Sequence, residues 1–224
     1  MGMARGRPVV GRAEAGMPEP EPTGMYPRAY RRQASPGPCL ARCSRLNQRD
    51  FLAMADNFVA VLMGSDSDLE TMQATLDTLD KLGVPWEVKI TSAHRTPDAT
   101  HAYVRDADER GCQVFIAAAG LAAHLAGTVA GLTLKPVIGI PMAAGPLNGQ
   151  DALLSTVQMP GGIPVACVAI GRAGAKNAAY LAAQILALSD PLLAKRLLDE
   201  RRDSAEAVLS KDQALKEKLQ RSRE

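Results

Sequence analysis

The chain has 224 residues, of which 46% are hydrophobic and 22% charged, and its formal net charge is +2. This length suits one domain, with or without tails, and so small a net charge gives no reason to expect nucleic acid or an anionic membrane as a partner. Aromatic residues make up only 4% of the chain and no basic stretch interleaves with them, which argues against a surface that stacks nucleic-acid bases.

Residues 1–53 differ in composition from the rest of the chain. They contain nine Arg, seven Pro and no Lys, and their apolar residues follow no period. Such a segment buries too little surface to offset the entropy lost on ordering, so we expect a disordered leader. It lacks the apolar region of a secretory signal. An organellar transit peptide and an early start-codon assignment both stay open; the second is favoured, because the pattern of a compact domain begins at Met54.

From Phe58 onward, apolar runs typical of buried strands alternate with amphipathic patterns typical of helices. Strands are predicted over 58–65, 86–93, 112–120, 136–143 and 164–171, and helices over 69–82, 96–110, from about 122, 150–158 and 173–188. Gly83 ends the first helix, and Thr96 as N-cap with Pro97 at the first helical position begins the second. The alternation predicts a three-layer α/β domain over residues 54–189, with a five-stranded parallel sheet.

The last two helices bear on assembly. The helix over 173–188 is small and apolar nearly all round, which is typical of a helix buried on more than one side and indicates a homo-oligomer. Asp190 and Pro191 begin an extra C-terminal helix, which we expect to fade into a charged tail after about Lys211. Residues 190–224 are therefore predicted to be a C-terminal helix and tail.

The cysteines and the longest apolar stretch favour a cytoplasmic protein. Cys112 and Cys167 lie in apolar strand-like runs, where a free thiol acts as a small hydrophobe. Cys39 and Cys43 have the spacing of metal ligands, but no second Cys/His pair follows them. Glycines and a His interrupt the apolar stretch 115–132, so a strand, a loop and a helix start explain it better than a membrane span.

Candidate functional residues lie in the loops that follow the strands, because ligands of open parallel sheets bind at the carboxyl ends of the strands. These loops read GSDSD, SAHRTP, AGLAAH, MAAGPLNG and GRAGAKN in chain order. Four are rich in Gly and small residues, which lets backbone N–H groups approach an anion. His94 is the imidazole at a strand end beside Ser and Arg, so it is the best candidate for a general acid/base. Arg95 suits a phosphate clamp.

Each candidate also has a simpler explanation. The stretch 64–68 could be a turn in which Asp68 caps the next helix, and Arg95 could be a surface charge. His124 could bind substrate or cap local structure, whereas His101 fits a structural position within a helix. No group of Asp, Glu and His has metal-ligand spacing and GxGxxG is absent, which disfavours a metal or a dinucleotide cofactor.

Five stretches, in order, resemble the PurE family of purine biosynthesis, and specifically its class I members, the 5-(carboxyamino)imidazole ribonucleotide mutases. They read VLMGSDSD, SAHRTP, AGLAAHLAG, VQMPGGIPV and AIGRAGAKNAAYLAAQIL, and the resemblance covers about residues 58–190. It implies a flavodoxin-like fold and an octamer around a four-fold axis. The implied substrate is an aminoimidazole ribonucleotide with a carbamate on its exocyclic amine, whose carboxylate moves to ring C4 without metal or organic cofactor.

The same resemblance implies roles for individual residues. Ser65, Asp68 and Arg95 would hold the ribose and 5′-phosphate, with Ser92 assisting. His94 would deliver a proton as the carbamate loses carbon dioxide, and would later remove the C4 proton. The remaining implied residues would line the pocket for carbon dioxide; they are Gly120, Ala122 and His124 after the third strand, and the loop from Ala143 to Gly149 after the fourth.

Two positions depart from the family pattern AGGAAHLPG. Leu121 stands where Gly is usual and Ala126 where Pro is usual. Because Leu needs more room than Gly and does not readily take positive φ, we expect a reshaped pocket at this point.

Three other functions compete with the mutase. Class II members carboxylate aminoimidazole ribonucleotide with free carbon dioxide and typically carry AGRSN where this chain has AGLAAH, which favours class I. A non-catalytic flavodoxin-like module that binds a phosphorylated ligand would keep Arg95 but would not need His94. A flavin-binding electron carrier would need aromatic residues in these loops, and they are lacking.

Overall fold

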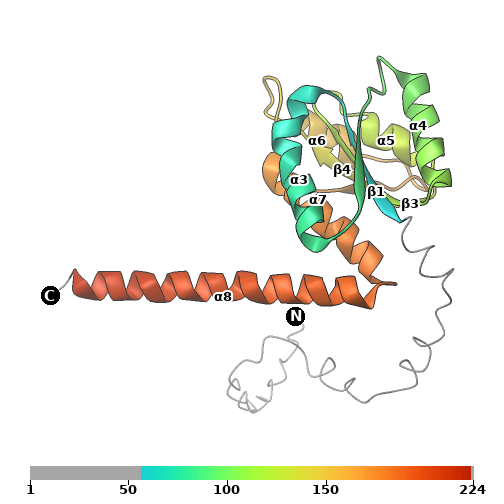
Figure 1. Ribbon diagram of the computed structural model, residues 1–224. Coiled ribbons are helices and arrows are strands. Elements are labelled where there is room, and N and C mark those ends of the chain that lie inside the picture. The colour runs from blue at the N-terminus through green and yellow to red at the C-terminus, as the bar shows by residue number, and fades with distance from the viewer. Residues whose placement is uncertain (1–56, 223–224) are drawn as a thin grey trace, which may run out of the picture. The chain divides into compact units, whose positions relative to one another are not determined.

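The protein is described by a computed structural model over residues 57–222, so the leader, with Cys39 and Cys43, lies outside the described residues. Five parallel strands form one sheet in the order β2-β1-β3-β4-β5. Figure 1 shows this sheet among the helices that surround it. The strands are β1 Phe58–Met63, β2 Trp86–Ile90, β3 Cys112–Ala119, β4 Val137–Pro141 and β5 Ala166–Cys167. This is the flavodoxin-like order, in which the direction of winding reverses between β1 and β3. The predicted fold class is confirmed.

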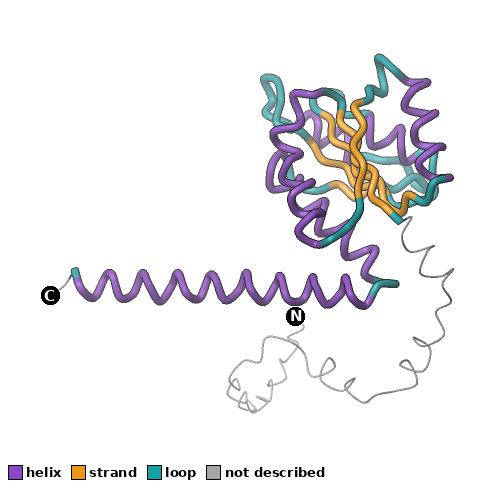
Figure 2. Tube along the Cα trace, viewed as in Figure 1, coloured by secondary structure: helices purple, strands orange, loops and turns teal. Residues whose placement is uncertain are grey.

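Helices cover both faces of the sheet (Figure 2). One face carries α3 (Leu69–Leu82) and α7 (Gly171–Ala187), and the other carries α4 (Pro97–Glu109), α5 (Leu125–Ala130) and α6 (Gln150–Val157). The strands are apolar at successive positions because both faces are buried. In β1, for example, Val59 and Val61 face the α3 and α7 side, whereas Ala60 and Leu62 face the α4 and α5 side.

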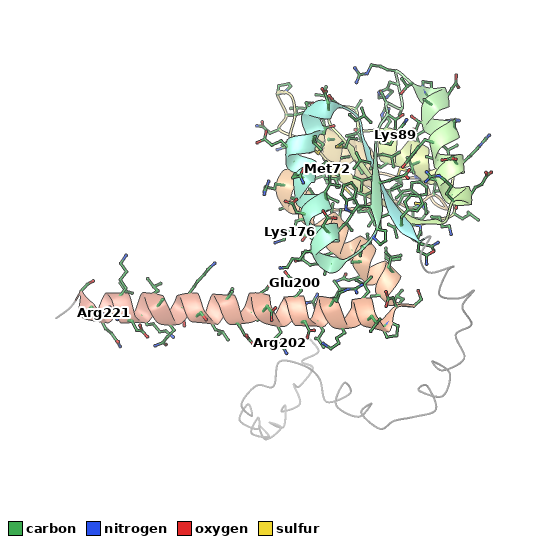
Figure 3. All side chains as sticks on the ribbon, in the orientation of Figure 1. Met72, Lys89, Lys176, Glu200, Arg202 and Arg221 are labelled. Carbon is green, nitrogen blue, oxygen red and sulfur yellow. The ribbon has the colours of Figure 1, made fainter. Side chains whose placement is uncertain are left out.

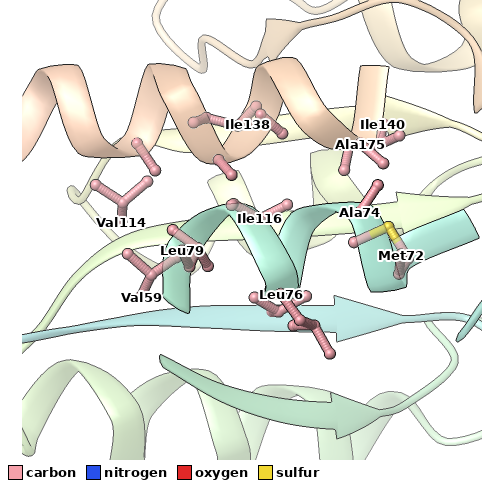
Figure 4. Close-up of a cluster of buried hydrophobic side chains, with 14 of the residues drawn as sticks. Val59, Met72, Ala74, Leu76, Leu79, Val114, Ile116, Ile138, Ile140 and Ala175 are labelled. Carbon is pink, nitrogen blue, oxygen red and sulfur yellow. The ribbon is translucent and has the colours of Figure 1, made fainter. Parts of the chain in front are cut away.

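The core between the sheet, α3 and α7 depends on small residues of α7. Its alanines pack against strand residues such as Ile138 and against Leu79 of α3 (Figure 4). The approach is close enough for the Thr75 hydroxyl of α3 to donate a hydrogen bond of 2.8 Å to the carbonyl of Ala175. Much of the apolar surface of α7 is thus covered by α3, β3, β4 and α8 of the same chain.

Several element boundaries differ from the predicted ones. β5 has two residues, and α5 begins at Leu125 instead of about Ala122. The C-terminal helix α8 spans Pro191–Arg221, so the expectation that it fades after Lys211 is wrong. Side chains four residues apart continue to pair along this stretch, as in Lys216–Asp212 and Arg221–Glu217, and such pairs stabilise an exposed helix.

The first turns of α8 are anchored to the domain. Asp190 caps the helix by accepting hydrogen bonds from the N–H groups of Leu192 and Leu193, and the Leu193 side chain is buried in the core. Further along lies Glu200, which is labelled in Figure 3. Its carboxylate pairs with Lys81 of α3 and accepts a hydrogen bond from the Tyr180 hydroxyl of α7. Within the described part of the chain, no helix has the length and apolar content that crossing a membrane requires.

Replacing Glu200 by Gln should lower the melting temperature at neutral pH by about 2–4 °C, which corresponds to about 1 kcal/mol for a pair whose Lys81 partner is largely exposed. The Lys81 ammonium, which donates a hydrogen bond to Glu200, holds the pKa of that carboxyl below its ordinary value of 4.5. A carboxyl whose pKa is lower in the folded than in the unfolded state stabilises the fold at any pH above its unfolded-state pKa. This stabilisation is lost as the pH falls through the folded-state pKa. The difference between variant and wild type should therefore vanish in acid. Glu206→Gln, on the exposed part of α8, is the control and should change little.

Candidate functional site

The candidate residues gather where the loops after β1, β2 and β3 meet, at the reversal point of the sheet. Ser65 and Asp68 follow β1, His94 and Arg95 follow β2, and His124 precedes α5. The loop after β1 is tied to β3 by a hydrogen bond of 3.1 Å from the N–H of Gly64 to the carbonyl of Ala118. These side chains, predicted to lie at one edge of the sheet, are close together in the structure.

The turn over residues 92–96 holds His94 and Arg95 in place. The backbone N–H of Thr96 bonds to the Ser92 carbonyl at 2.9 Å, and the Thr96 hydroxyl accepts a 2.9 Å bond from the Ser92 N–H. The Ser92 hydroxyl in turn accepts from the N–H of Arg95 at 3.1 Å. Ser92 therefore stabilises the turn that presents the two candidate side chains.

Thr96 differs from its predicted role. It stands at the N-cap of α4, but its side chain makes no capping hydrogen bond, because its hydroxyl is used by Ser92. Sequence reasoning also missed Thr91, which is buried and shares a hydroxyl–hydroxyl bond of 2.7 Å with Thr100 of α4. The available signal was the spacing of three threonines around SAHRTP, which ties the end of β2 to the start of α4.

His94 and His124 form a direct pair. The His94 Nε2 and His124 Nδ1 atoms lie 2.8 Å apart, and the rings meet edge to face. One of these two nitrogens carries the hydrogen and the other supplies a lone pair. If one proton is added to a ring nitrogen outside this bond, the hydrogen bond between the two rings persists. If both rings are imidazolium, an N–H group would face another N–H group and the bond would be lost. Both side chains are exposed, so they can reach a ligand. The contact favours the ligand-binding explanation of His124 over local capping.

Arg95 reaches the loop after β1. Its Nη2 donates a hydrogen bond of 3.2 Å to the carbonyl of Gly64, so the guanidinium lies beside Ser65 while remaining exposed. This placement suits a guanidinium that binds an anion jointly with the loop. It favours the predicted phosphate clamp over the explanation of Arg95 as an isolated surface charge.

Asp68 does not act as a helix cap. It occupies the N-cap position of α3, yet its side chain makes no capping bond. Burial raises the pKa of Asp68 above its ordinary value. It is Ser65 that caps, since its hydroxyl accepts from the N–H of Ser67 at 3.3 Å in the short 3₁₀ helix Asp66–Asp68. The simpler explanation of the GSDSD loop, in which Asp68 caps the helix, is therefore wrong, and the capping residue is Ser65.

The loops after β3 and β4 lie against each other through small residues. The N–H of Met142 bonds to the carbonyl of Ala119 at 2.9 Å, and a Cβ added to Gly120 would lie 3.0 Å from the Cβ of Ala144. Ala122 and Ala143 are exposed at this edge. Gly149 is buried, with φ of 85°, and a Cβ there would come within 2.8 Å of the Met142 carbonyl oxygen.

The expectation about Leu121 is corrected by the structure. Leu121 adopts φ of 56°, the left-handed conformation that a leucine was expected to avoid. The backbone at this position therefore has a conformation that suits Gly, although the residue is Leu. Ala126, the second departure, is buried in the first turn of α5 and lies close to Gly139 of β4. Within residues 57–222, no three His, Cys, Asp or Glu side chains gather as a group that could hold a metal ion.

Comparison with known proteins assigns the family. The sequence profile of the AIR carboxylase family matches residues 58–207. The chain is 54% identical to the N5-carboxyaminoimidazole ribonucleotide mutase of Bacillus subtilis over 156 residues, which cover 69% of this chain and 96% of that protein. It is 52% identical to the mutase of Escherichia coli K12 over 151 residues, 67% of this chain and 89% of that protein.

A solved structure gives the same assignment at the level of the fold. The crystal structure of Treponema denticola PurE superposes with a TM-score of 0.65 at 29% identity, and the match covers 71% of this chain and 98% of that one. The mutases, at 52% and 54% identity, are much more similar in sequence to this chain than the protein of this structure is. The chain belongs to the AIR carboxylase family, that of the PurE proteins, and within it to class I.

Proposed function

We propose that this protein is an N5-carboxyaminoimidazole ribonucleotide mutase of de novo purine biosynthesis. It moves the carboxylate of 5-(carboxyamino)imidazole ribonucleotide from the exocyclic nitrogen to ring C4. The observation that carries the proposal is the His94–His124 pair at 2.8 Å, exposed beside Arg95 at the reversal point of the sheet. The mutases at 52% and 54% identity support the reaction class.

In this proposal His94 serves both halves of the reaction. As the carbamate C–N bond breaks, its electron pair returns to the nitrogen, His94 delivers a proton there, and carbon dioxide forms. Ring C4 then attacks that carbon dioxide, and His94 removes the C4 proton, so no net proton is gained or lost. An imidazole can both donate and accept a proton, which suits a proton that is lent and recovered. His124 would fix the tautomer of His94 through their shared hydrogen bond.

The other candidate residues position the substrate. Arg95, with Ser65 and Asp68, would hold the 5′-phosphate and ribose, and Ser92 assists by bracing their turn. Gly120, Ala122 and the loop from Ala143 to Gly149 would enclose carbon dioxide. Because carbon dioxide is neutral and diffusible, the site has to confine it against the ring rather than stabilise a charge, and small backbone-lined walls suit that purpose.

A comparison of two substrates tests the proposed function. The protein is incubated with the carbamate ribonucleotide, and separately with aminoimidazole ribonucleotide and bicarbonate. A mutase forms the C4 carboxylate rapidly from the first mixture and far more slowly from the second. Faster product formation from the second mixture would indicate a class II carboxylase, and no product from either would indicate a non-catalytic module.

We propose further that the protein works in the cytoplasm as a homo-octamer. The family resemblance supports the octamer, and the exposed apolar residues Leu198, Val208, Leu209 and Leu215 of α8 offer contact area to other subunits. Sedimentation at micromolar concentration should give a species near eight chains. A monomer under these conditions would contradict the proposal.

Residues 1–53 are proposed to take no part in folding or catalysis, since the match to the family begins at residue 58. Removing them should leave the melting temperature and the specific activity nearly unchanged. A fall in melting temperature of more than a few degrees on deletion would show that the leader packs on the domain.

A further inference from the structure

The second half of α8 carries exposed apolar side chains. The first turns of the helix pack on the domain, with Leu193 buried, but from Arg201 to Ser222 every residue is exposed except the half-buried Ala205. From Leu198 onward, five bulky apolar side chains of α8 have more than half of their surface exposed; they are Leu198, Val208, Leu209, Leu215 and Leu219. The described part of the chain therefore leaves them largely uncovered.

These five side chains lie on one side of the helix. An α-helix turns by about 100° per residue, which places all five, together with Ala205, within an arc of about 120°. We call these six residues the α8 stripe. An apolar stripe of this width is typical of a helix that packs against a neighbour along its length. The pattern is thus that of a packed helix, although its own domain does not cover it.

Most of the α8 stripe lies beyond the part of the helix that the family shares. The family match ends at residue 207, whereas α8 continues to Arg221. Four of the six stripe residues follow the end of the match, and every candidate site residue precedes it. The stripe is therefore a contact surface of this chain rather than a part of the candidate site.

The charges along α8 favour a second copy of the helix running in the opposite direction. Residues 199–206 contain four acidic and two basic side chains, whereas residues 211–221 contain four basic and two acidic ones. In an antiparallel pair the acidic segment of each helix lies beside the basic segment of the other. A parallel pair would place segments of like charge side by side, which is unfavourable.

An anionic membrane surface fits this helix less well. Helices that lie on membranes carry mainly Lys and Arg on their polar side. The polar side chains of α8 instead combine both signs, as in the ion pairs Lys216–Asp212 and Arg221–Glu217. A second copy of this chain is therefore the partner that the charges favour.

We infer that residues 198–221 of α8 pair in antiparallel orientation with the same segment of a second copy of this chain. Both copies use the same surface, as in a contact with two-fold symmetry, so that each covers the α8 stripe of the other. The pairing adds a contact of this chain's own to the proposed octamer. It concerns assembly and does not depend on the proposed reaction.

Hydrogen exchange of the α8 amides tests the pairing. An exposed single helix opens and exchanges its amide hydrogens rapidly, whereas a paired helix is protected. Exchange over residues 198–221 is followed by mass spectrometry in the full-length protein at micromolar concentration. Replacing Leu209 and Leu215 together by Glu should raise the exchange rate of this segment about tenfold or more, because two buried apolar contacts are lost. Ser210→Glu, next to Leu209 but outside the stripe, is the control and should leave the rate unchanged.

Reversal of charge tests the direction of the pair. Asp203→Lys combined with Glu206→Lys makes both segments basic, and Lys211→Glu combined with Lys218→Glu makes both segments acidic. Each of these double variants should lose protection over residues 198–221. The variant with all four substitutions has opposite charges on the two segments again, so an antiparallel pair should recover the wild-type exchange rate.

Three results would overturn the inference. They are rapid exchange over residues 198–221 in the wild-type protein, protection that is equal in all the charge variants, and a fourfold variant that fails to recover. Conversion of the carbamate ribonucleotide is measured alongside and should be the same in wild type and all variants. A wild-type protein that converts none of it would overturn the proposed function while the exchange result stands.

Discussion

Replacing His94 by Asn is expected to lower kcat by about 10²–10⁴-fold while substrate binding stays mostly intact. Asn keeps a similar size and one hydrogen bond, so the contact with His124 can be partly retained. It cannot carry a proton, and in the proposed mechanism one imidazole serves both proton transfers. The loss should therefore fall on the chemical step and be visible in steady-state kinetics as a lower kcat with nearly the same KM.

His101 provides the matched control for this experiment. It is an exposed histidine on α4, outside the group formed by His94, Arg95 and His124. His101→Asn should leave both kcat and KM at their wild-type values. If His94→Asn instead retains a near wild-type kcat, the imidazole is only a binding group and the proposed role is wrong.

Replacing Arg95 by Ala should raise KM by about tenfold or more, with a smaller effect on kcat. The variant loses a charge-assisted contact to the phosphate worth about 1.5–3 kcal/mol, and this contact acts equally on substrate and transition state. Ser65→Ala and Asp68→Ala should resemble it, because they are proposed to hold the same part of the ribonucleotide.

The control for the Arg95 variant is Arg105→Ala, an exposed arginine further along α4. It removes the same charge from the protein without touching the loop of Gly64, so KM should not change. An Arg95→Ala variant that loses kcat but keeps KM would show that the guanidinium acts in the chemical step, against the division of roles between Arg95 and His94.

Much of the fold could be predicted because its signals are local. The apolar run of β1 and the helical period ended by Gly83 in the left-handed conformation appear where the pattern placed them. Loops that follow parallel strands meet at one edge, so the approach of Arg95 to Gly64 follows from the topology. The group of site residues was therefore accessible from sequence, although not its internal contacts.

What could not be predicted depends on contacts between distant residues or on competition between close ones. Thr is a common helix cap, but the Thr96 hydroxyl hydrogen-bonds to the Ser92 backbone instead of capping α4. The positive φ of Leu121 is set by the loop that faces it, where Gly145 leaves room. The pairing of His94 with His124, thirty residues apart, required the alignment of β2, β1 and β3 before it could be seen.

The fate of the carboxylate carbon in the wild-type protein distinguishes a mutase from a carboxylase directly. The carbamate ribonucleotide is labelled with ¹³C at the carboxylate and converted in buffer that contains excess unlabelled bicarbonate, over times short against spontaneous decarboxylation. Transfer within a closed site predicts that nearly all of the C4 carboxylate carries ¹³C. A product whose carboxylate carries the isotope ratio of the buffer would mean that carbon dioxide is released and taken up from solution, which would contradict the mutase mechanism.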